Sequence, residues 1–362
     1  MNNPGRWLMI PCALLLLLTG CNGNSRIVDR INIVTAMGFD RAEHGYKGTA
    51  FFSEFKDTGK VHTLQGSAPQ IEMIRNQIDH QSTMPIKIAK LRLLLFTQSL
   101  AEAGLSPLIH TICKDPLLSN YLTVAIFAGS LKSLSDHLEG KTNDRLPYYL
   151  LEDSVTSKGL PRSNLSTFLY DFYGEGRDIS VPYIRLNQND KVEIAGFAIL
   201  KKDRLQLLIN PAETLQFGIL QGKPIRGYLP FDLHAGKHEG TAVFTLQYNK
   251  MSRKLLRQGS ELRVVYHLSL HGMVKEYPEW LNLRDTRQMH EMLEQLALQV
   301  REHSLELIRK FQQNQVDPLG VGDLYRVHHR KWRESTFYQS EYPRITFDVQ
   351  VKLHLTKSGI GE

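Results

Sequence analysis

Hydrophobic residues in the first half of this chain fall into short runs that are separated by polar turns. Residues 27–55 contain apolar, partly alternating runs broken by glycine, which predicts a strand, a turn and a second strand. Apolar positions within residues 71–78 recur at three- and four-residue steps, which is typical of one face of a helix. A strand over residues 86–96, a helix over 99–113 and a strand over 121–127 follow with short connections. This order predicts a mixed α/β layer.

The two halves are separated by residues 174–190, which are rich in glycine and polar residues and typical of a connection between units. Residues 192–209 then predict a hairpin with its turn at Lys201–Asp203. We therefore divide the mature chain into an N-terminal α/β region, residues 21–190, and a C-terminal α+β domain, residues 191–362. The N-terminal region is compatible with one subdomain or with two.

The C-terminal half combines strands with one long helix. Residues 240–274 contain β-branched and aromatic residues in alternation, which predicts several strands. Between residues 285 and 315, apolar residues form one stripe with charges opposite, which predicts a single long helix. A final alternating strand spans residues 345–355. We expect an antiparallel sheet covered by this helix, within an α+β, multi-domain fold of mixed sheets and packed helices.

The N-terminal segment resembles a targeting signal. Arg6 is the only charge before an apolar run from Trp7 to Leu18, and this run is shorter than the roughly 20 residues that span a bilayer as a helix. The run ends in Leu-Thr-Gly-Cys at residues 18–21, which resembles a bacterial lipobox. We predict a lipoprotein signal peptide over residues 1–20 and lipidation of Cys21, which would anchor the mature protein without a membrane span. The alternative is an ordinary secretory signal cut nearby, with Cys21 incidental.

Composition and charge narrow the class of protein. The chain has 362 residues, of which 42% are hydrophobic and 22% charged, as expected for a globular protein. A net charge of +7 suits a protein beside anionic lipids. The sequence contains no dense tract of basic residues interleaved with aromatic ones, so we do not expect a nucleic-acid partner. After Cys12 and Cys21 are assigned to the signal and the anchor, Cys113 is the one remaining thiol, so no intramolecular disulfide is expected. Its apolar neighbours favour a buried structural thiol over a catalytic one.

Candidate catalytic motifs are incomplete. Gly140–Thr142 resembles the end of a phosphate loop, but Ser135 stands where the motif requires glycine, and the preceding residues predict a helix rather than a strand. His290 resembles the first ligand of a zinc-protease helix, but Glu294 replaces the second histidine. Basic residues flank His328–His329 and would repel a divalent cation. We therefore expect no enzyme activity, no metal and no cofactor.

Several strings, in order, are similar to those of the Ger(x)C spore germination lipoproteins. They are Asp29–Asn32 followed by a strand ending in Asp40, Lys114-Asp115-Pro116, the segment IAGFAILKKDRLQLLINPAETL, and Asp317–Gly322 followed by Trp332. Two departures matter: Asn22-Gly23 replaces the family's Trp-Asp, and Lys114 replaces an arginine, which loses a planar, bidentate donor. We interpret Asp317, Gly320 and Gly322 as a helix stop and tight loop, and Trp332 as a core anchor or a possible interface residue.

The resemblance implies a non-enzymatic subunit of a nutrient germinant receptor. This subunit would sit on the outer face of the spore inner membrane of an endospore-forming bacterium, with two membrane-embedded receptor subunits as partners. The family has no catalytic residues to transfer. Two alternatives follow from the residues alone: a solute-binding lipoprotein of a transporter, also tethered by Cys21, and an exported hydrolase that uses the His290 region.

Overall fold

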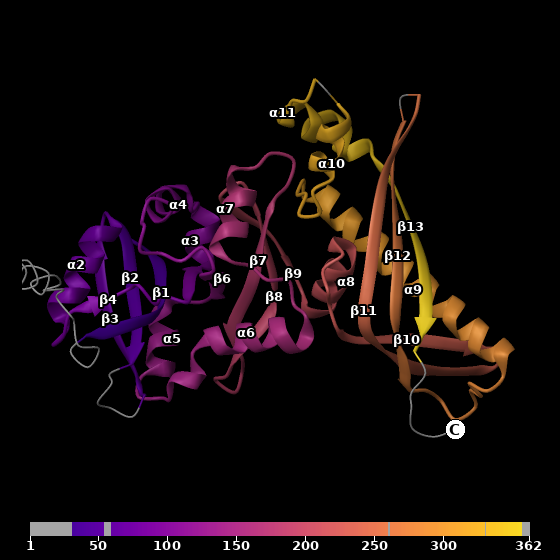
Figure 1. Cartoon of the computed structure of the whole chain (residues 1–362), viewed down its shortest axis with the longest axis horizontal. Coiled ribbons are helices and arrows are strands. Elements are labelled where there is room, and N and C mark those ends of the chain that lie inside the picture. Colours follow the sequence, from indigo (N-terminus) through magenta and orange to yellow (C-terminus); the bar gives the residue numbers. More distant parts are fainter. Residues whose placement is uncertain (1–30, 54–58, 260, 330, 357–362) are drawn as a thin grey trace, which may run out of the picture.

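The computed structural model describes residues 31–53, 59–259, 261–329 and 331–356, which form two lobes, each built on its own sheet (Figure 1). The lobes lie end to end along the long axis of the molecule (Figure 1). Cys21 and residues 1–20 lie outside the described residues. Within the described ranges, no helix is long and apolar enough to cross a membrane.

The first lobe contains a mixed sheet of nine strands, in the order β3-β2-β1-β5-β6-β7-β8-β9, with β4 paired to β1. Strands β1, β5, β6 and β7 are mutually parallel, and the outer strands are antiparallel to their neighbours. Its strands are β1 (Asn32–Ala42), β2 (Gly45–Ser53), β3 (Val61–Ala68), β4 (Ile86–Lys87), β5 (Leu93–Thr97), β6 (Thr123–Ala128), β7 (Ile179–Leu186), β8 (Val192–Lys201) and β9 (Arg204–Ile209).

Helices cover both faces of this sheet because its central strands are apolar on both sides. The continuous apolar strand β5 buries Leu94 and Phe96 in one core and Leu93 and Leu95 in the other. The first core is closed by α2, α3, α4 and α7, and the second by α5 and α6. These helices are α2 (Ile71–Gln81), α3 (Gln98–Ala103), α4 (Ser106–Ile112), α5 (Leu131–Leu138), α6 (Pro147–Lys158) and α7 (Leu165–Tyr173), with a short 3-10 turn, η2 (Asn143–Arg145).

The second lobe places one long helix across a four-stranded sheet in the order β10-β11-β12-β13. Its helix α9 buries one apolar stripe, including Met292, Leu296 and Phe311, against the sheet, which confirms the helix expected from the periodicity. The elements of this lobe are α8 (Pro211–Gln221), β10 (Gly227–Ala235), β11 (His238–Gln258), β12 (Glu261–Glu276), α9 (Thr286–Gln313), α10 (Val321–His328), α11 (Glu334–Thr336), the π turn η3 (Phe337–Glu341), the 3-10 turn η4 (Tyr342–Arg344) and β13 (Thr346–Leu355).

The expected antiparallel C-terminal sheet requires one correction. Strands β10, β11 and β12 are antiparallel neighbours, but β13 runs parallel to β12. The chain leaves β12, returns through α9 and re-enters the sheet in the same direction, as a crossover through a helix allows. The sheet is therefore mixed.

The expected boundary at residue 190 falls inside the first sheet rather than between the two sheets. The predicted hairpin forms as β8 and β9, with Lys202 in the left-handed conformation at its turn (φ 56°). Because β8 pairs with β7, the hairpin extends the first sheet. The chain reaches the second lobe after Ile209, where α8 begins.

The prediction of a buried Cys113 is wrong. Helix α4 buries Leu108, Ile109 and Ile112, and Cys113 follows at its exposed end. Its Sγ lies 3.3 Å from the carbonyl oxygen of His110.

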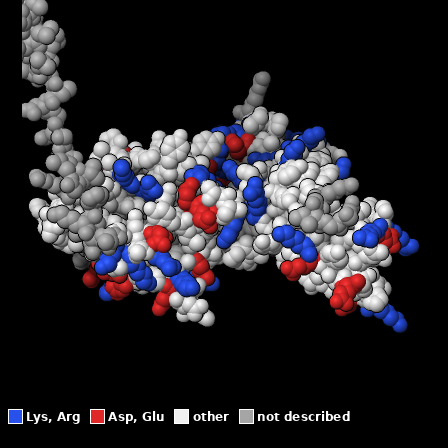
Figure 2. Space-filling view, turned by 60° about the horizontal axis from the view of Figure 1, so that its bottom comes forward, with Lys and Arg blue, Asp and Glu red and all other residues white. Residues whose placement is uncertain are grey.

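On the face shown in Figure 2, Lys and Arg side chains are interspersed with Asp and Glu, so neither sign of charge dominates that face.

Candidate functional site at the junction of the two lobes

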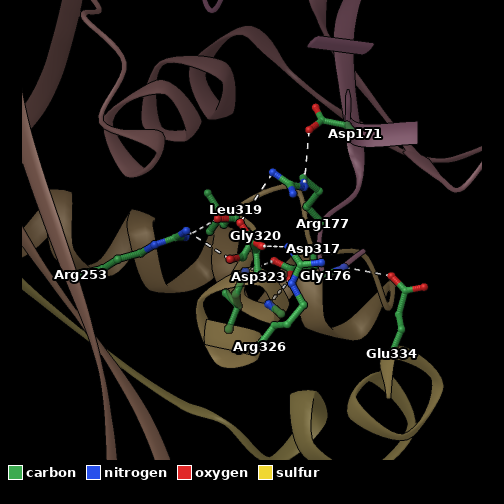
Figure 3. A network of polar contacts seen from close by, with 12 residues as sticks. Asp171, Gly176, Arg177, Arg253, Asp317, Leu319, Gly320, Asp323, Arg326 and Glu334 are labelled. Carbon is green, nitrogen blue, oxygen red and sulfur yellow. Dashed lines mark hydrogen bonds and ion pairs between the residues drawn. The ribbon is translucent and has the colours of Figure 1, made fainter. Parts of the chain in front are cut away.

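The junction is built from two chain segments that are far apart in the sequence. Residues 175–178 lead into β7 of the first lobe. In the second lobe, residues 317–323 contain the end of the connection between α9 and α10 and the start of α10. In Figure 3 these two segments face each other, and polar contacts connect them. The 317–323 loop follows a left-handed residue, Gln315 (φ 54°), and contains a second, Gly320 (φ 66°). This geometry confirms the helix stop and tight loop expected here.

Asp317 lies at the centre of the junction and is completely buried. Its carboxylate accepts hydrogen bonds from the backbone N–H of Val321 (2.9 Å), the N–H of Gly322 (2.7 Å) and the hydroxyl of Tyr338 (3.1 Å). It therefore supplies acceptors to the first N–H groups of α10, which have no partner within that helix. Its own backbone N–H donates to Oδ2 of Asp178 at 2.6 Å.

Asp178 provides the first lobe's half of this contact. Its backbone N–H donates to the carbonyl oxygen of Asp317 at 3.0 Å, so the two residues are bonded in both directions. Its buried carboxylate also pairs with Nζ of Lys201 at 3.1 Å. That ammonium lies 3.7 Å from the centre of the Tyr338 ring, a cation–π contact that links β8 to η3.

Burial controls the ionisation of these carboxyl groups. Complete burial raises the pKa of Asp317 to about 7, although the N–H groups of the following loop act in the opposite direction. Burial also raises the pKa of Asp178, opposed by the positive charge of Lys201. Desolvation raises the pKa of Asp171 to about 6, opposed by Arg177. The junction thus holds carboxyl groups that are easier to protonate than ordinary ones.

A second set of contacts surrounds this centre. The carbonyl oxygen of Gly176 accepts from the N–H of Asp323 at 2.8 Å, and the Gly176 N–H donates to the Glu334 carboxylate at 3.0 Å. Arg253 on β11 donates to the carbonyl oxygens of Leu319 and Gly320 (Figure 3). These bonds fix the loop from both lobes.

Arg177 connects the two lobes by charge. Its guanidinium lies 3.6 Å from the Asp323 carboxylate and 4.0 Å from that of Asp171, and it stacks over the Tyr170 ring at 3.9 Å. Because its side chain is 13% exposed, solvent screens these interactions only in part.

Two glycines allow the segments to approach this closely. Gly176 has a φ of +81°, and a Cβ on it would lie 2.5 Å from the backbone nitrogen of Asp323. A Cβ on Gly322 would lie 2.8 Å from the Cα of Gly176. Any side chain at either position would force the lobes apart.

The predicted interface residue Trp332 lies at the edge of this junction. Its indole Nε1 donates to the carboxylate of Glu175 at 2.6 Å, and its ring packs 5.2 Å from that of Phe337. It is half-buried against the core of the second lobe. A contact between Trp332 and a partner protein stays a prediction.

A cleft of about 540 Å³ opens beside the junction. Its charged walls include Asp171, Arg177, Asp178, Lys201 and Glu334, and each of these already has a partner within the protein. Across the described ranges, no three His, Cys, Asp or Glu side chains are arranged to hold a metal ion. The arrangement is suited to holding two lobes together.

The other candidate residues lie apart from the junction. His290 and Glu294 form an exposed pair, 3.2 Å apart, on the surface of α9. Gly140–Thr142 follows helix α5, as predicted, and the Gly140 N–H donates to the carbonyl oxygen of Val61. Asp40 accepts from the hydroxyl of Thr97 at 2.8 Å.

Asp115, from the Lys-Asp-Pro string, shapes its own turn. It accepts from the N–H of Leu117 at 2.9 Å and from the guanidinium of Arg75 at 2.5 Å. It therefore shapes its own turn and also ties this turn to helix α2, which carries Arg75.

The fold and the junction can now be set beside known proteins. Residues 24–186 match the family described as "Spore germination protein N-terminal domain", and residues 195–359 match "Spore germination B3/ GerAC like, C-terminal". These matches cover most of the chain in the expected order, so the chain belongs to the spore germination B3/GerAC-like family. This confirms the resemblance to the Ger(x)C spore germination proteins.

Individual relatives agree with the assignment. The spore germination protein GerQC of Bacillus cereus is 25% identical over an alignment of 366 positions, which covers 99% of this chain and 99% of that protein. The solved crystal structure of the GerBC protein has 13% identity and a TM-score of 0.60 over 90% of this chain and 98% of that one. The structural likeness shows that the multi-domain α+β fold is shared. The family is one of spore germination proteins and is not a known class of enzyme.

Sequence reasoning found one side of the junction and missed the other. Asp317 and Gly322 were singled out as loop residues, but Asp178 and Lys201 carry no local motif that would connect them to that loop. The sequence feature that could have indicated the first lobe's side of the junction is Gly174-Glu175-Gly176, where two glycines precede a strand.

Proposed function

We propose that the chain is the lipid-anchored, non-enzymatic subunit of a spore nutrient germinant receptor. In this proposal Cys21 carries the lipid, and the body lies on the outer face of the spore inner membrane. Two membrane-embedded receptor subunits are its partners. The subunit is needed for receptor assembly and for the response to germinants.

The observation that supports this proposal most directly is the ordered match of two spore germination domains along nearly the whole chain. The junction is consistent with it. Asp178 contacts both Asp317 and Lys201 within the junction, and these contacts join the two lobes into one body. Such a body is suited to assembly.

Copurification tests the assembly. The chain carrying an affinity tag at its C-terminus is isolated from detergent-solubilised spore membranes, and the coeluting proteins are identified. Recovery of two membrane-embedded receptor subunits supports the proposal. Recovery of the tagged chain alone, under conditions that preserve other spore membrane complexes, contradicts it. A Cys21→Ala strain separates the anchor from assembly, because it should move the chain to the soluble fraction.

A solute-binding lipoprotein of a transporter is the second candidate, and the cleft of about 540 Å³ is the observation that favours it. Ligand sites of this volume are common in proteins. The alternative predicts that the purified mature chain binds an amino acid or a sugar on its own. A calorimetric screen that finds no binding would remove it.

A further inference from the structure

The sheet of the second lobe has an outer face, opposite α9, on which six polar side chains form two rows across three strands. One row is Lys250, Ser269 and Lys352, and the next is Ser252, His267 and Gln350. The residues between the two rows, Met251, Leu268 and Val351, pack in the core beneath α9. Because successive side chains of a strand point to opposite faces of the sheet, both polar rows face away from α9. Together they line a shallow groove of about 510 Å³. We call this surface the outer sheet face.

The outer sheet face is basic. Lys250 and Lys352 lie at its two edges, and Lys254 is in an adjoining row on β11. Among the described residues, none of these three lysines is in an ion pair. The carboxylate of Asp348, in the row of Lys254, is neutralised by Arg263 at 3.0 Å. The lysine charges are therefore available to an external anion.

Two larger side chains flank these charges. Tyr248 lies at the middle of β11 and Leu256 near its C-terminal end, on the same side of the strand, and each is 43% exposed. The Tyr248 ring stacks on His271 at 4.1 Å, and His271 stacks on His354 at 4.3 Å. Tyrosine beside lysine is typical of residues at a lipid–water interface.

We propose that the outer sheet face docks on a membrane surface that contains anionic lipids. The unpaired lysines are spread across three strands rather than gathered at one point, which fits a flat layer of headgroups better than a single acidic segment. Tyr248 and Leu256 supply the apolar contacts that such binding also uses. This inference goes beyond the receptor proposal and does not depend on its partners.

The position of the face gives the proposal a structural consequence. The strand that follows the N-terminal segment, β1, belongs to the first lobe, and the outer sheet face belongs to the second (Figure 1). An anchor that precedes the first lobe and a docking face on the second lobe would attach the body to the membrane through both lobes. The lobes would then lie along the membrane.

Vesicle cosedimentation tests the face without the anchor. The mature chain, residues 21–362, carries Cys21→Ser so that it cannot be lipidated, and is mixed with vesicles of phosphatidylcholine alone or with added phosphatidylglycerol. We expect binding to the anionic vesicles, little binding to the neutral ones, and loss of binding at high salt because salt screens exposed charges.

Matched variants locate the binding. Lys250→Ala with Lys352→Ala should lower affinity for anionic vesicles by roughly 10- to 30-fold, because each basic residue near an anionic surface contributes measurably. Arg287→Ala with Arg309→Ala removes the same charge from exposed positions of α9, on the opposite side of the sheet, and should have a much smaller effect. Circular dichroism and thermal unfolding check that both variants fold.

Three results would overturn the proposal: equal binding to both kinds of vesicle, equal effects of the two double variants, or no vesicle binding while the chain binds soluble polyglutamate through the same lysines. The last result would assign the face to an acidic protein partner. None of these results bears on the germination response, so the receptor proposal stands or falls separately.

Discussion

Replacing Asp317 with alanine should release the loop that joins the two lobes. The change removes the acceptor for two backbone N–H groups and for the hydroxyl of Tyr338, all within the junction. Leaving a buried donor without a partner costs about 1–3 kcal/mol. Water that enters the vacated space offsets part of this cost, so we expect a loss of about 3–5 kcal/mol in the free energy of unfolding.

Urea unfolding near neutral pH, followed by tryptophan fluorescence, measures this loss, because Trp332 lies at the edge of the junction. Asp232→Ala is the matched control. Asp232 is exposed on β10, and its carboxylate accepts a 3.3 Å hydrogen bond from the hydroxyl of Thr241. Its replacement by alanine should change stability by less than about 0.5 kcal/mol. If Asp317→Ala and Asp232→Ala shift the transition equally, the argument that Asp317 organises the junction is wrong.

The pH dependence of stability gives a second test of the same carboxyl group. The pKa of Asp317 is about 7 in the folded protein, above its ordinary value of 3.8, so the folded state holds a proton that the unfolded state has released. The stability due to this proton is complete below pH 3.8 and is lost as the pH rises to about 7. Asp317→Asn cannot titrate, so its stability should fall less over this range. A slope unchanged by the substitution would contradict the assignment.

Three further changes test the contacts around Asp317. Gly176→Ala should lower the free energy of unfolding by at least about 2 kcal/mol, because the φ of Gly176 is +81° and a Cβ there would lie 2.5 Å from backbone. Gly140→Ala is the control: the φ of Gly140 is +72°, but a Cβ there would meet open space, so the change should cost only about 1 kcal/mol. Lys201→Met should cost about 3 kcal/mol in urea unfolding, because it leaves the buried carboxylate of Asp178 without its cation; a cost below about 1 kcal/mol would refute the pairing. Trp332→Phe should lower stability by about 1 kcal/mol, since it keeps an aromatic ring and loses one hydrogen bond, and an unchanged melting temperature would show that this bond contributes nothing.

Much of the fold could be predicted because periodicity reports which face of an element is buried. The stripe of α9 and the alternation of β13 both follow from contact with one core. The same pattern carries no information on strand direction, so the parallel pairing of β13 with β12 was missed. The burial of a residue at a helix end is also hard to predict, because each further residue turns the side chain to a different side of the helix. Ile112 faces the core, and the next residue, Cys113, faces the solvent.

The candidate site was less predictable than the fold. The loop at Asp317 and Gly322 could be recognised from its glycines and from the helix before it. Its partner Asp178 lies in another lobe, and nothing near it in sequence indicates that its carboxylate would be buried. A contact between distant segments depends on how the lobes meet, which local patterns do not encode.

Dipicolinate release from spores tests the central proposal most directly. Spores that lack this chain, spores complemented with the wild type and spores that carry Cys21→Ala are exposed to a panel of nutrients. The proposal predicts that the deletion abolishes the response to particular nutrients, that wild type restores it, and that Cys21→Ala restores it less well. Responses that are identical in all strains across the panel would contradict a role of this chain as a germinant receptor subunit.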